Sequence, residues 1–489
     1  MTEVEISTIA LMVREALDGP DRLLVEDGWG RWGLSTSQTL SLAEMLMEVL
    51  GDRASRPLVA YLQKSRLYYA FTACCFLNRL SYCPIDASNP LQRVLDVAAQ
   101  LPDAIIVCDN EEVLASILER KIDGIRISED FTREDRENRD AVAMPGTKSP
   151  HYCIATSGST GTPKLVLVPH DHTIPFVRWA VPFYRIGQGC RWAQFSSIGF
   201  DLSLVDFLSV VCGGGVLISL SSQLDRMRPA LAVKRCRITH WHSVPSMIPY
   251  FLIDSVGDDQ STCQVFSFCG EPLQRANADK LMARYPGARI VNTYGPTEGT
   301  LFCSFFEYRP NDETVVGDFV PIGQPIPPWN FILIPEERAE RLVLIAPNIA
   351  DGYVGTESAA FAAVDLFGFR LRAFDTGDRV KRLGLHLYFS HRVDTMVKVN
   401  GNRLDLAEVE AVAQRLGFTN PMAFVVGSGV TLVAEGEQDA VTLLIQQLGE
   451  HLPQYGVPNV VRVVPAHPRT PSGKLDRRAV RKSLGENSE

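Results

Sequence analysis

The chain has 489 residues, a length that predicts more than one domain, because a domain usually holds about 100–200 residues. Hydrophobic residues make up 46% of the chain and charged residues 21%, which is ordinary for a protein with a buried core and excludes a mainly disordered or fibrous chain. The net charge of −9 makes the surface as a whole unsuited to polyanions, so we expect no nucleic-acid partner.

The N-terminal residues 1–19 place Glu3, Glu5, Arg14 and Glu15 among apolar residues at helical spacing. This pattern predicts a surface helix and not a secretory signal, which would need a basic start followed by an apolar core. No run of about 18 uncharged apolar residues occurs, so we expect no membrane span. The 11 cysteines are odd in number and contain no CxxC pair, which indicates buried thiols in a reducing cytoplasm.

Short apolar, strand-like runs alternate with longer helical patterns up to about residue 316. The strand-like runs occupy residues 104–108, 216–219, 264–269 and 289–292, and one clear helical pattern occupies residues 272–285. Strands that alternate with helices at this spacing favour an α/β fold with largely parallel sheets.

The composition changes after about residue 316, where proline and glycine become frequent and short strands dominate to about residue 399. This change predicts a small β-rich subdomain. From Asp394 onward the pattern is strand, helix (406–416), strand, helix (440–452), strand. That order is sufficient for an independent α+β lid.

A loop suited to phosphate follows the apolar residues 152–155. Glycines let backbone N–H groups turn inward, hydroxyls add donors and a lysine adds positive charge, which together are the groups that anions require. The loop lacks the GxxxxGK[ST] pattern of a Walker A loop, and an ordinary surface loop rich in Ser, Thr and Gly is the alternative. The residues concerned are Thr156, Ser157, Gly158, Ser159, Thr160, Gly161 and Lys164.

This segment resembles the phosphate loop of the ANL superfamily of adenylate-forming enzymes, which includes acyl-CoA synthetases, peptide-synthetase adenylation domains and luciferases. The resemblance continues, in order, over nearly the whole chain. The further matching segments are residues 81–86 (SYCPID, followed by Pro90 and Arg93), 200–203 (FDLS), 292–298 (NTYGPTE), 374–378 (FDTGD), 391–408 and 468–477 (PRTPSGKLDR). The sequence departs from the family pattern at Leu165, Phe374 and His391, where the family usually has glycine, tyrosine and glycine.

The resemblance implies an α/β fold with a large N-terminal domain, residues 1–393. This domain would hold two mainly parallel sheets with packed helices and, at about 316–393, the β-rich subdomain. A small mobile α+β lid domain would follow at residues 394–489. The implied reaction has two steps. A carboxylate attacks the α-phosphate of ATP to give an acyl-AMP and pyrophosphate, and a thiol then displaces AMP.

The resemblance also implies which residues hold the nucleotide. The loop from Thr156 to Lys164 would hold the β- and γ-phosphates, and Glu298 would hold Mg²⁺, a hard ion that prefers oxygen ligands. Tyr294 offers a flat face and Asn292 an amide for adenine, while Asp378 suits the ribose hydroxyls. The other implied ATP or AMP contacts are Arg392, Gly270, Glu271, Thr293, Gly295, Pro296 and Thr297.

Lys474 is the most specific catalytic candidate. In the family pattern this lysine reaches from the lid to the substrate carboxylate and the α-phosphate, where a positive charge stabilises the charge that develops in the transition state. Without the resemblance, Lys474 would be one more basic residue in a tail that also holds Arg469, Arg477 and Arg478.

Asp201 indicates which class of acid is activated. A buried carboxylate beside the acyl group pairs with the α-ammonium of an amino acid, whereas fatty or aryl acids offer no such partner. We therefore expect an amino-acid substrate. The other positions that line the site in the family pattern are Leu202, Val205, His242, Ser267, Cys269, Thr293, Leu301 and Phe302.

Two of these positions leave alternatives open. His242 lies in a THWH segment and is read as a metal ligand, a structural histidine or part of the substrate site. Cys269 lies in an FCGE segment similar to that of the D-alanine–carrier protein ligase branch of the family. A cysteine wall admits only a short side chain, so we expect alanine or another small amino acid.

The thiol acceptor is expected to be a separate carrier protein that bears phosphopantetheine, because only 15 residues follow Lys474. The two half-reactions need different surroundings, so the lid is expected to rotate about Asp394. The hairpin that contains Lys398 and Gly401 would then face the acyl site during thiolation.

Two other functions remain open at this stage, an acyl- or aryl-CoA synthetase and a non-catalytic nucleotide-binding relative. The pathway also remains open between teichoic-acid alanylation and natural-product assembly such as antibiotic biosynthesis.

Overall fold

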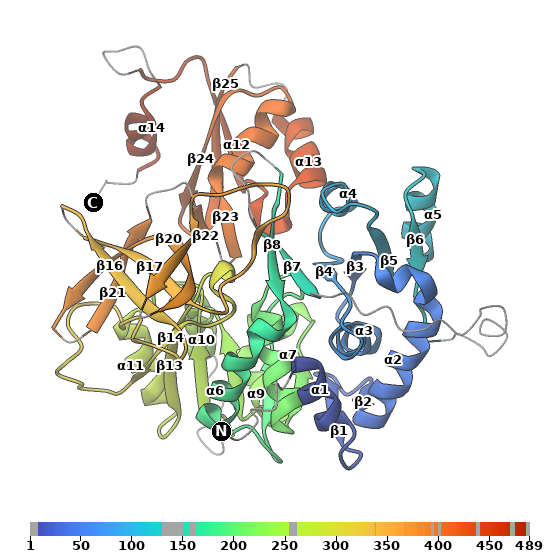
Figure 1. The fold of residues 1–489 in the computed structure, drawn as a ribbon. Coiled ribbons are helices and arrows are strands. Elements are labelled where there is room, and N and C mark those ends of the chain that lie inside the picture. Colours follow the sequence, from blue (N-terminus) through green and yellow to red (C-terminus); the bar gives the residue numbers. More distant parts are fainter. Residues whose placement is uncertain are drawn as a thin grey trace. The chain divides into compact units, whose positions relative to one another are not determined.

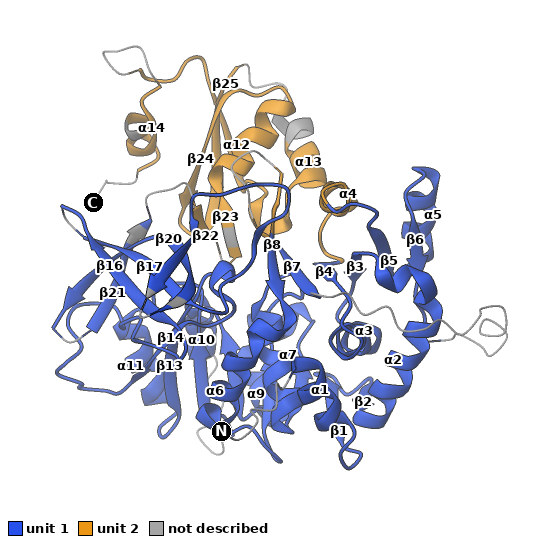
Figure 2. Ribbon diagram, viewed as in Figure 1, with its two compact units in different colours: residues 1–86, 101–154, 166–393 blue, residues 87–100, 155–165, 394–489 orange. Residues whose placement is uncertain are grey.

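Contacts divide the chain into two compact units in the computed structural model (Figure 2). Unit 1 comprises Met1–Asp86, Leu101–Ile154 and Val166–Val393, and unit 2 comprises Ala87–Gln100, Ala155–Leu165 and Asp394–Glu489. Unit 2 thus combines the residues expected to form the lid with two short segments from earlier in the sequence. The structure describes residues 8–129, 150–156, 162–253, 262–337, 339–366, 368–384, 386–392, 396–399, 402–436, 441–469 and 475–485.

Figure 1 shows the fold and labels many of its helices and strands. Unit 1 contains a nine-stranded sheet that is parallel in its middle and antiparallel at both ends. Its order is β15-β14-β13-β12-β11-β9-β10-β1-β2, and the pairs from β13 to β1 are parallel. Its strands are β1 (Leu23–Asp27), β2 (Gly33–Ser35), β9 (Arg191–Gln194), β10 (Val216–Ser219), β11 (His240–Ser243), β12 (Val265–Phe268), β13 (Arg289–Tyr294), β14 (Ser304–Tyr308) and β15 (Gln324–Pro325).

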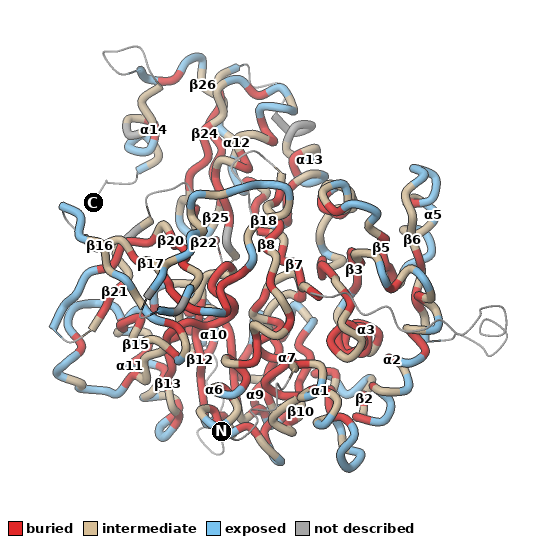
Figure 3. Tube along the Cα trace, in the orientation of Figure 1, coloured by how far each residue is buried: buried red, intermediate tan, exposed pale blue. Residues whose placement is uncertain are grey.

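Helices pack against both faces of this sheet, and the two faces differ in chemistry. One face carries Trp241, Phe266 and Ile290, which pack with side chains of α9 (Pro229–Cys236), α10 (Ile248–Ile253) and α11 (Arg275–Arg284) in one apolar cluster. The opposite face carries Val265 and Val291, which belong to a second cluster with α6 (Ile174–Tyr184) and α7 (Leu202–Gly213). Figure 3 shows α7 and these strands as largely buried.

A second sheet of unit 1 has seven strands in the order β18-β8-β7-β4-β3-β5-β6. One inner strand, β3 (Leu58–Leu62), is buried along its whole length, as expected for a parallel strand covered on both faces. The other strands are β4 (Tyr82–Asp86), β5 (Ile105–Cys108), β6 (Gly124–Arg126), β7 (His151–Thr156), β8 (Lys164–Pro169) and β18 (Gly352–Tyr353).

The helices of the N-terminal region begin at polar caps, which explains where they start. Thr8 caps α1 (Ile9–Leu17), and Ser35 forms a capping box with Gln38 at α2 (Thr36–Leu50). Ser65 caps α3 (Arg66–Leu77), which is almost completely buried. The remaining helices of unit 1 are η1 (Gly51–Ser55), α5 (Glu111–Glu119), η3 (His170–Thr173), α8 (Gln223–Met227), η4 (Pro245–Met247) and η5 (Thr297–Gly299).

The β-rich subdomain is an antiparallel sheet in the order β16-β17-β20-β19, with β21 paired to β20. Its strands are β16 (Asn330–Pro335), β17 (Glu340–Ala346), β19 (Phe361–Leu366), β20 (Phe369–Leu383) and β21 (His386–Arg392).

Unit 2 has its own apolar core, to which Leu404, Val409, Leu432 and Leu448 contribute. Its strands form a hairpin, β22 (Met396–Val399) with β23 (Asn402–Asp405), and a sheet in the order β24-β25-β26. The other elements are α4 (Leu91–Ala98), α12 (Leu406–Arg415), β24 (Thr419–Val426), β25 (Gly429–Glu435), α13 (Val441–His451), η7 (Gln454–Gly456), β26 (Val460–Val464) and α14 (Arg477–Ser483).

The fold confirms the α/β architecture predicted from the sequence, with two mainly parallel sheets and packed helices. The predicted strands at 104–108, 216–219, 264–269 and 289–292 correspond to β5, β10, β12 and β13, and the predicted helix at 272–285 to α11. No disulfide joins any of the 11 cysteines, all of which the structure describes. Within the described part of the chain, no helix is both long and apolar enough to cross a bilayer.

Candidate active site

Most of the predicted site residues in unit 1 gather at the edge of the nine-stranded sheet where its parallel strands end. Asp201 follows β9, Cys269 follows β12 and Glu298 follows β13. Parallel strands in register deliver the residues after their carboxyl ends to one edge of the sheet, which is where open α/β sheets bind ligands. The fold therefore brings together residues that are almost 100 positions apart in the sequence.

Asn292 is oriented by two backbone carbonyls. Its Nδ2 donates to Pro321 O at 2.7 Å and to Val320 O at 3.4 Å, and the side chain is buried. Its Oδ1 is buried and has no hydrogen-bond partner in the structure. A buried acceptor without a partner is costly, and the exocyclic amine of adenine is a donor that would satisfy it. The amide thus fits the adenine contact predicted from the sequence.

Tyr294, Asp378 and Arg392 form one hydrogen-bonded group. The Tyr294 hydroxyl donates to Asp378 Oδ2 at 2.6 Å, and Arg392 Nη1 donates to Asp378 Oδ1 at 2.5 Å. Burial raises the pKa of Tyr294 well above its usual value and the Asp378 carboxylate adds to this, so the hydroxyl remains a donor. Each carboxylate oxygen keeps a second lone pair for a ribose hydroxyl. Arg392, which the sequence predicted as a nucleotide contact, is hydrogen-bonded to the Asp378 carboxylate.

Glu298 is fully buried in η5 and accepts a hydrogen bond from the Tyr353 hydroxyl at 2.8 Å. In the described residues no group of three or more His, Cys, Asp or Glu side chains could hold a metal. A Mg²⁺ ion fits such a site because it binds through one or two carboxylates and takes its other oxygens from phosphates and water. Glu298 would be the protein ligand.

The turn that carries Glu298 requires glycine at Gly295. A Cβ atom at this position would lie 2.0 Å from Leu301 O, and backbone cannot give way as a flexible side chain can. Thr300 and Leu301 have φ values of 67° and 64°, a left-handed conformation that is rare for residues other than glycine. Such strain persists where the surrounding structure holds it, and it clusters at functional sites.

The predicted substrate residues are buried together. Asp201 is 8% exposed and precedes the first residue of α7, while Val205, His242, Ser267 and Phe302 are 0% exposed. The remaining members are the buried Cys269, Thr293 and Leu301 and the half-buried Leu202.

Strand register sets the face of the sheet on which these residues lie. His242 pairs with Ser267 across β11 and β12, so both lie on the face that α6 and α7 cover. Cys269 is two residues beyond Ser267, and Thr293 two beyond Val291, which places them on the same side. Asn292 lies on the opposite face, so the strands separate the predicted adenine contact from the predicted amino-acid site.

His242 has a partner that the sequence analysis missed. Its Nδ1 lies 2.7 Å from Oδ1 of Asp206 on α7, and Trp192 Nε1 donates to the same oxygen at 2.8 Å. Burial raises the pKa of Asp206, and the nearby His242 and Lys64 oppose the increase. The signal in the sequence was a lone carboxylate within the helix 202–213, whose other residues are all uncharged.

Two further predicted residues, Gly270 and Glu271, have features that stabilise the local structure. Gly270 has a φ of 96°, which favours glycine. Glu271 accepts from the backbone N–H of Ser246 at 2.9 Å and from its hydroxyl at 3.3 Å, which ties it to the short helix η4. The sequence predicted that Glu271 contacts the nucleotide. The contacts that the structure describes for Glu271 are with η4.

The phosphate loop belongs to unit 2, and its tip, Ser157 to Gly161, lies outside the described residues. Its two ends are joined, because the Thr156 hydroxyl donates to Lys164 O at 3.2 Å. Leu165, which replaces the usual glycine, is 0% exposed and lies in β8. This departure therefore adds a buried apolar side chain at the base of the loop.

Most of the residues predicted to take part in the lid movement lie outside the part of the chain that the structure describes. Lys474, Asp394 and Gly401 lie outside the described residues, whereas Lys398 is exposed on β22.

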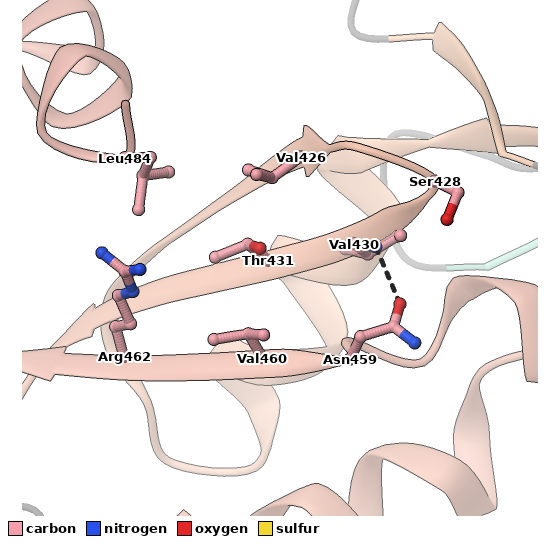
Figure 4. A pocket seen from close by; sticks show the side chains of 9 residues that line it. Val426, Ser428, Val430, Thr431, Asn459, Val460, Arg462 and Leu484 are labelled. Carbon is pink, nitrogen blue, oxygen red and sulfur yellow. Dashed lines mark hydrogen bonds between the residues drawn. The ribbon is translucent and has the colours of Figure 1, made fainter. Parts of the chain in front are cut away.

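Unit 2 also contains a pocket of about 310 Å³ that none of the predicted site residues lines. It lies on the sheet β24-β25-β26, where Val426, Val460 and Leu484 supply apolar walls and Arg462 a charge (Figure 4). Asn459 Oδ1 accepts from the Val430 backbone N–H at 3.1 Å across its floor. None of its lining residues carries a carboxylate.

The family model for AMP-binding enzymes matches residues 20–363, more than half of the chain. A D-alanine–D-alanyl carrier protein ligase of Bacillus cytotoxicus is 26% identical over 466 residues, which cover 90% of this chain and 91% of that protein. A second ligase of this name, from Listeria welshimeri, is 25% identical, with 92% and 93% covered.

Solved structures show the same fold. The adenylation domain AlmE of Vibrio cholerae, in complex with glycyl-adenosine-5′-phosphate, matches with a TM-score of 0.82 and 20% identity over 98% of this chain and 97% of that one. The family match, together with the retained motifs, confirms the resemblance seen in the sequence. The chain belongs to the AMP-binding enzymes of the ANL superfamily and is an ATP-dependent, adenylate-forming ligase.

Proposed function

We propose that the protein activates a small amino acid and transfers it to the phosphopantetheine thiol of a separate carrier protein. In the first step a substrate carboxylate oxygen attacks the α-phosphorus of ATP, the bond to the β-phosphate breaks and pyrophosphate leaves. In the second step the thiolate attacks the acyl carbon and AMP leaves.

The buried carboxylate of Asp201 carries the proposal of an amino-acid substrate. It is 8% exposed and lies beside Leu202 and Val205 at the start of α7, among the buried predicted substrate residues. A carboxylate at this position attracts the α-ammonium of an amino acid, because opposite charges pair and form charge-assisted hydrogen bonds. An acyl- or aryl-CoA synthetase has no use for this charge. The similar ligases of Bacillus and Listeria, whose names specify D-alanine, support the amino acid.

The nucleotide roles follow the same argument. Asn292 Oδ1 would accept from adenine, Asp378 would bind the ribose, and Glu298 would hold Mg²⁺, which would neutralise phosphate charge when bound. Lys164 and the phosphate loop would hold the β- and γ-phosphates, and Lys474 would stabilise the charge that develops at the α-phosphate.

The carrier step rests on the named relatives and on the resemblance. The relatives are carrier protein ligases, and another similar structure, PA1221, contains adenylation and PCP domains. The lid would turn about Asp394, and the hairpin with Lys398 and Gly401 would face the acyl site.

A reducing cytoplasm suits a chain in which no disulfide joins the 11 cysteines.

ATP–pyrophosphate exchange with matched acids tests the first step. Alanine and propionate differ only in the ammonium group, so the wild type should exchange with alanine and hardly with propionate. In Asp201→Ala this preference should collapse by roughly 10²-fold or more, because the charged partner is lost. Exchange with simple acids alone would support a CoA synthetase, and no exchange with any acid would support a non-catalytic relative.

A second assay tests transfer. Gly401→Leu should keep pyrophosphate exchange but lose acylation of a phosphopantetheinylated carrier protein, because a bulky side chain would fill the path of the pantetheine arm. Equal loss of both half-reactions would indicate misfolding and contradict this role.

A further inference from the structure

The predicted amino-acid site contains a buried imidazole nitrogen without a partner. His242 is 0% exposed, and its Nδ1 lies 2.7 Å from Asp206 Oδ1. Because this oxygen already accepts from Trp192, we assign the Nδ1 proton to His242, which donates it to the carboxylate. The other ring nitrogen, Nε2, is buried and has no hydrogen-bond partner.

The other neutral polar side chains of the site are already hydrogen-bonded. The Ser267 hydroxyl lies 2.9 Å from the Tyr184 hydroxyl, and the Thr293 hydroxyl donates to Phe268 O at 2.9 Å. Among the predicted substrate residues that the structure describes, His242 alone has a buried side-chain nitrogen or oxygen atom without a partner. Buried polar atoms are almost always hydrogen-bonded, so Nε2 indicates where a bound molecule places a polar group.

The surroundings restrict that group to a short one. The ring centroid of Phe302 lies 5.2 Å from that of the His242 imidazole, and the two rings are nearly perpendicular. The ring centroid of Trp192 lies 6.3 Å from that of the imidazole. Phe302 and Trp192 are both fully buried, so the aromatic rings that contact the imidazole leave little room for a long group.

Charge decides between the polar groups that could fit. A side-chain carboxylate would place a second negative charge near Asp206, whose Oδ2 is also buried without a partner. A side-chain ammonium would compete with Lys64, a buried cation that already interacts with Asp206. A hydroxyl avoids both costs, because it donates to a neutral imidazole and accepts from a protonated one.

We propose that the substrate is a small amino acid with a side-chain hydroxyl that binds His242 Nε2, and that Asp206 is a positioning residue that fixes the imidazole. This inference rests on the proposed function, since it concerns the amino acid that the proposed enzyme activates. It narrows the expectation drawn from Cys269, which was alanine or another small amino acid.

Matched pairs of amino acids in pyrophosphate exchange test the inference. Serine is paired with alanine, and threonine with 2-aminobutyrate, each pair differing by one hydroxyl and each amino acid supplied in both enantiomers. The wild type should favour the hydroxyl member by about 10- to 100-fold in kcat/KM, because the alternative leaves Nε2 unpaired. His242→Phe should bring the ratio close to one.

Two further variants separate positioning from folding. Asp206→Asn keeps an acceptor for Trp192 but no charge to fix the imidazole, so it should raise the KM for serine several-fold more than the KM for alanine and lower the serine-to-alanine ratio of kcat/KM. His240→Phe is the matched control on the same strand, because His240 Nε2 already bonds Tyr184 O at 2.7 Å. Its serine-to-alanine ratio should equal that of the wild type.

The ratios decide the result even if a variant is partly unfolded. A wild-type preference for alanine over serine would overturn the inference and leave the proposed function intact. A serine preference that survives His242→Phe would also overturn it and would assign Nε2 to a buried water. Exchange with simple acids but with no amino acid would overturn the proposed function and this inference together.

Discussion

His170 should make the protein sensitive to acid, and replacing it with phenylalanine should remove that sensitivity. The imidazole is 1% exposed, lies 4.4 Å from the ring of Phe76, and both of its nitrogens are buried without a hydrogen-bond partner. Burial, helped by the positive charge of Arg79, lowers the pKa of His170 to about 3. The folded protein therefore keeps this histidine neutral well below neutral pH.

The size of the effect follows from the two pKa values. An unfolded histidine has a pKa of about 6.5, so below that pH the unfolded state binds a proton that the folded state refuses until about pH 3. The contribution of His170 to stability is thus lost as the pH falls from 6.5 towards 3. The loss is about 1.4 kcal/mol per pH unit, or roughly 2 kcal/mol at pH 5.

Urea unfolding of the wild type and His170→Phe at pH 7.5 and pH 5.0 measures this difference. Phenylalanine keeps the aromatic packing and removes two unsatisfied nitrogens, so the variant should be at least as stable at pH 7.5. Its advantage should grow by about 2 kcal/mol at pH 5.0. An identical change in stability with pH for both proteins, or an NMR titration of His170 near pH 6.5 in the folded protein, would refute the reasoning.

Three further predictions concern the site and unit 2. Lys474→Ala should slow acyl-AMP formation by about 10²–10³ with ATP affinity nearly intact, and near-normal single-turnover formation would contradict its role. Arg93→Met should cost about 3–5 kcal/mol in denaturant unfolding, because Arg93 and Glu408 form a buried pair at 2.8 Å whose Glu408 Oε2 has no partner. The double variant with Glu408→Leu should recover most of that loss, and simple additivity of the two changes would disprove the coupling. Gly295→Ala should lower kcat/KM by about 10² or more, and a normal value would show that the 295–303 turn tolerates a side chain.

The sequence predicts the elements and the local motifs well because both depend on short-range patterns. The strand β12 and the helix α11 were predicted from apolar runs and their spacing. Asp201 and Glu298 could be selected as candidates for the site because each lies in a short segment that the family pattern contains. The matched segments also predicted that these residues share one site, and the parallel sheet places both after the ends of its strands.

Contacts between residues that are far apart in the chain could not be predicted from the sequence. Asp206 and His242 are 36 positions apart, and no local pattern pairs a carboxylate inside an apolar helix with a histidine on a later strand. The same holds for the Tyr353 hydroxyl that binds Glu298, 55 positions away. Sequence spacing also leaves the orientation of Asn292 undetermined, since only the carbonyls of Val320 and Pro321 decide which amide atom remains for adenine.

One turn connects the two halves of the predicted site. Glu298, the proposed Mg²⁺ ligand, and Phe302, a proposed wall of the amino-acid site, lie on the same strained segment. The segment is held by the bond from Trp329 Nε1 to Gly299 O at 2.7 Å and by that from the Thr300 hydroxyl to Asn348 O at 2.6 Å. A Cβ at Gly295 would push against Leu301 O and move the whole turn. Gly295→Ala should therefore raise the apparent KM for ATP and for the amino acid together, whereas a change in one alone would mean that the two ends of the turn move independently.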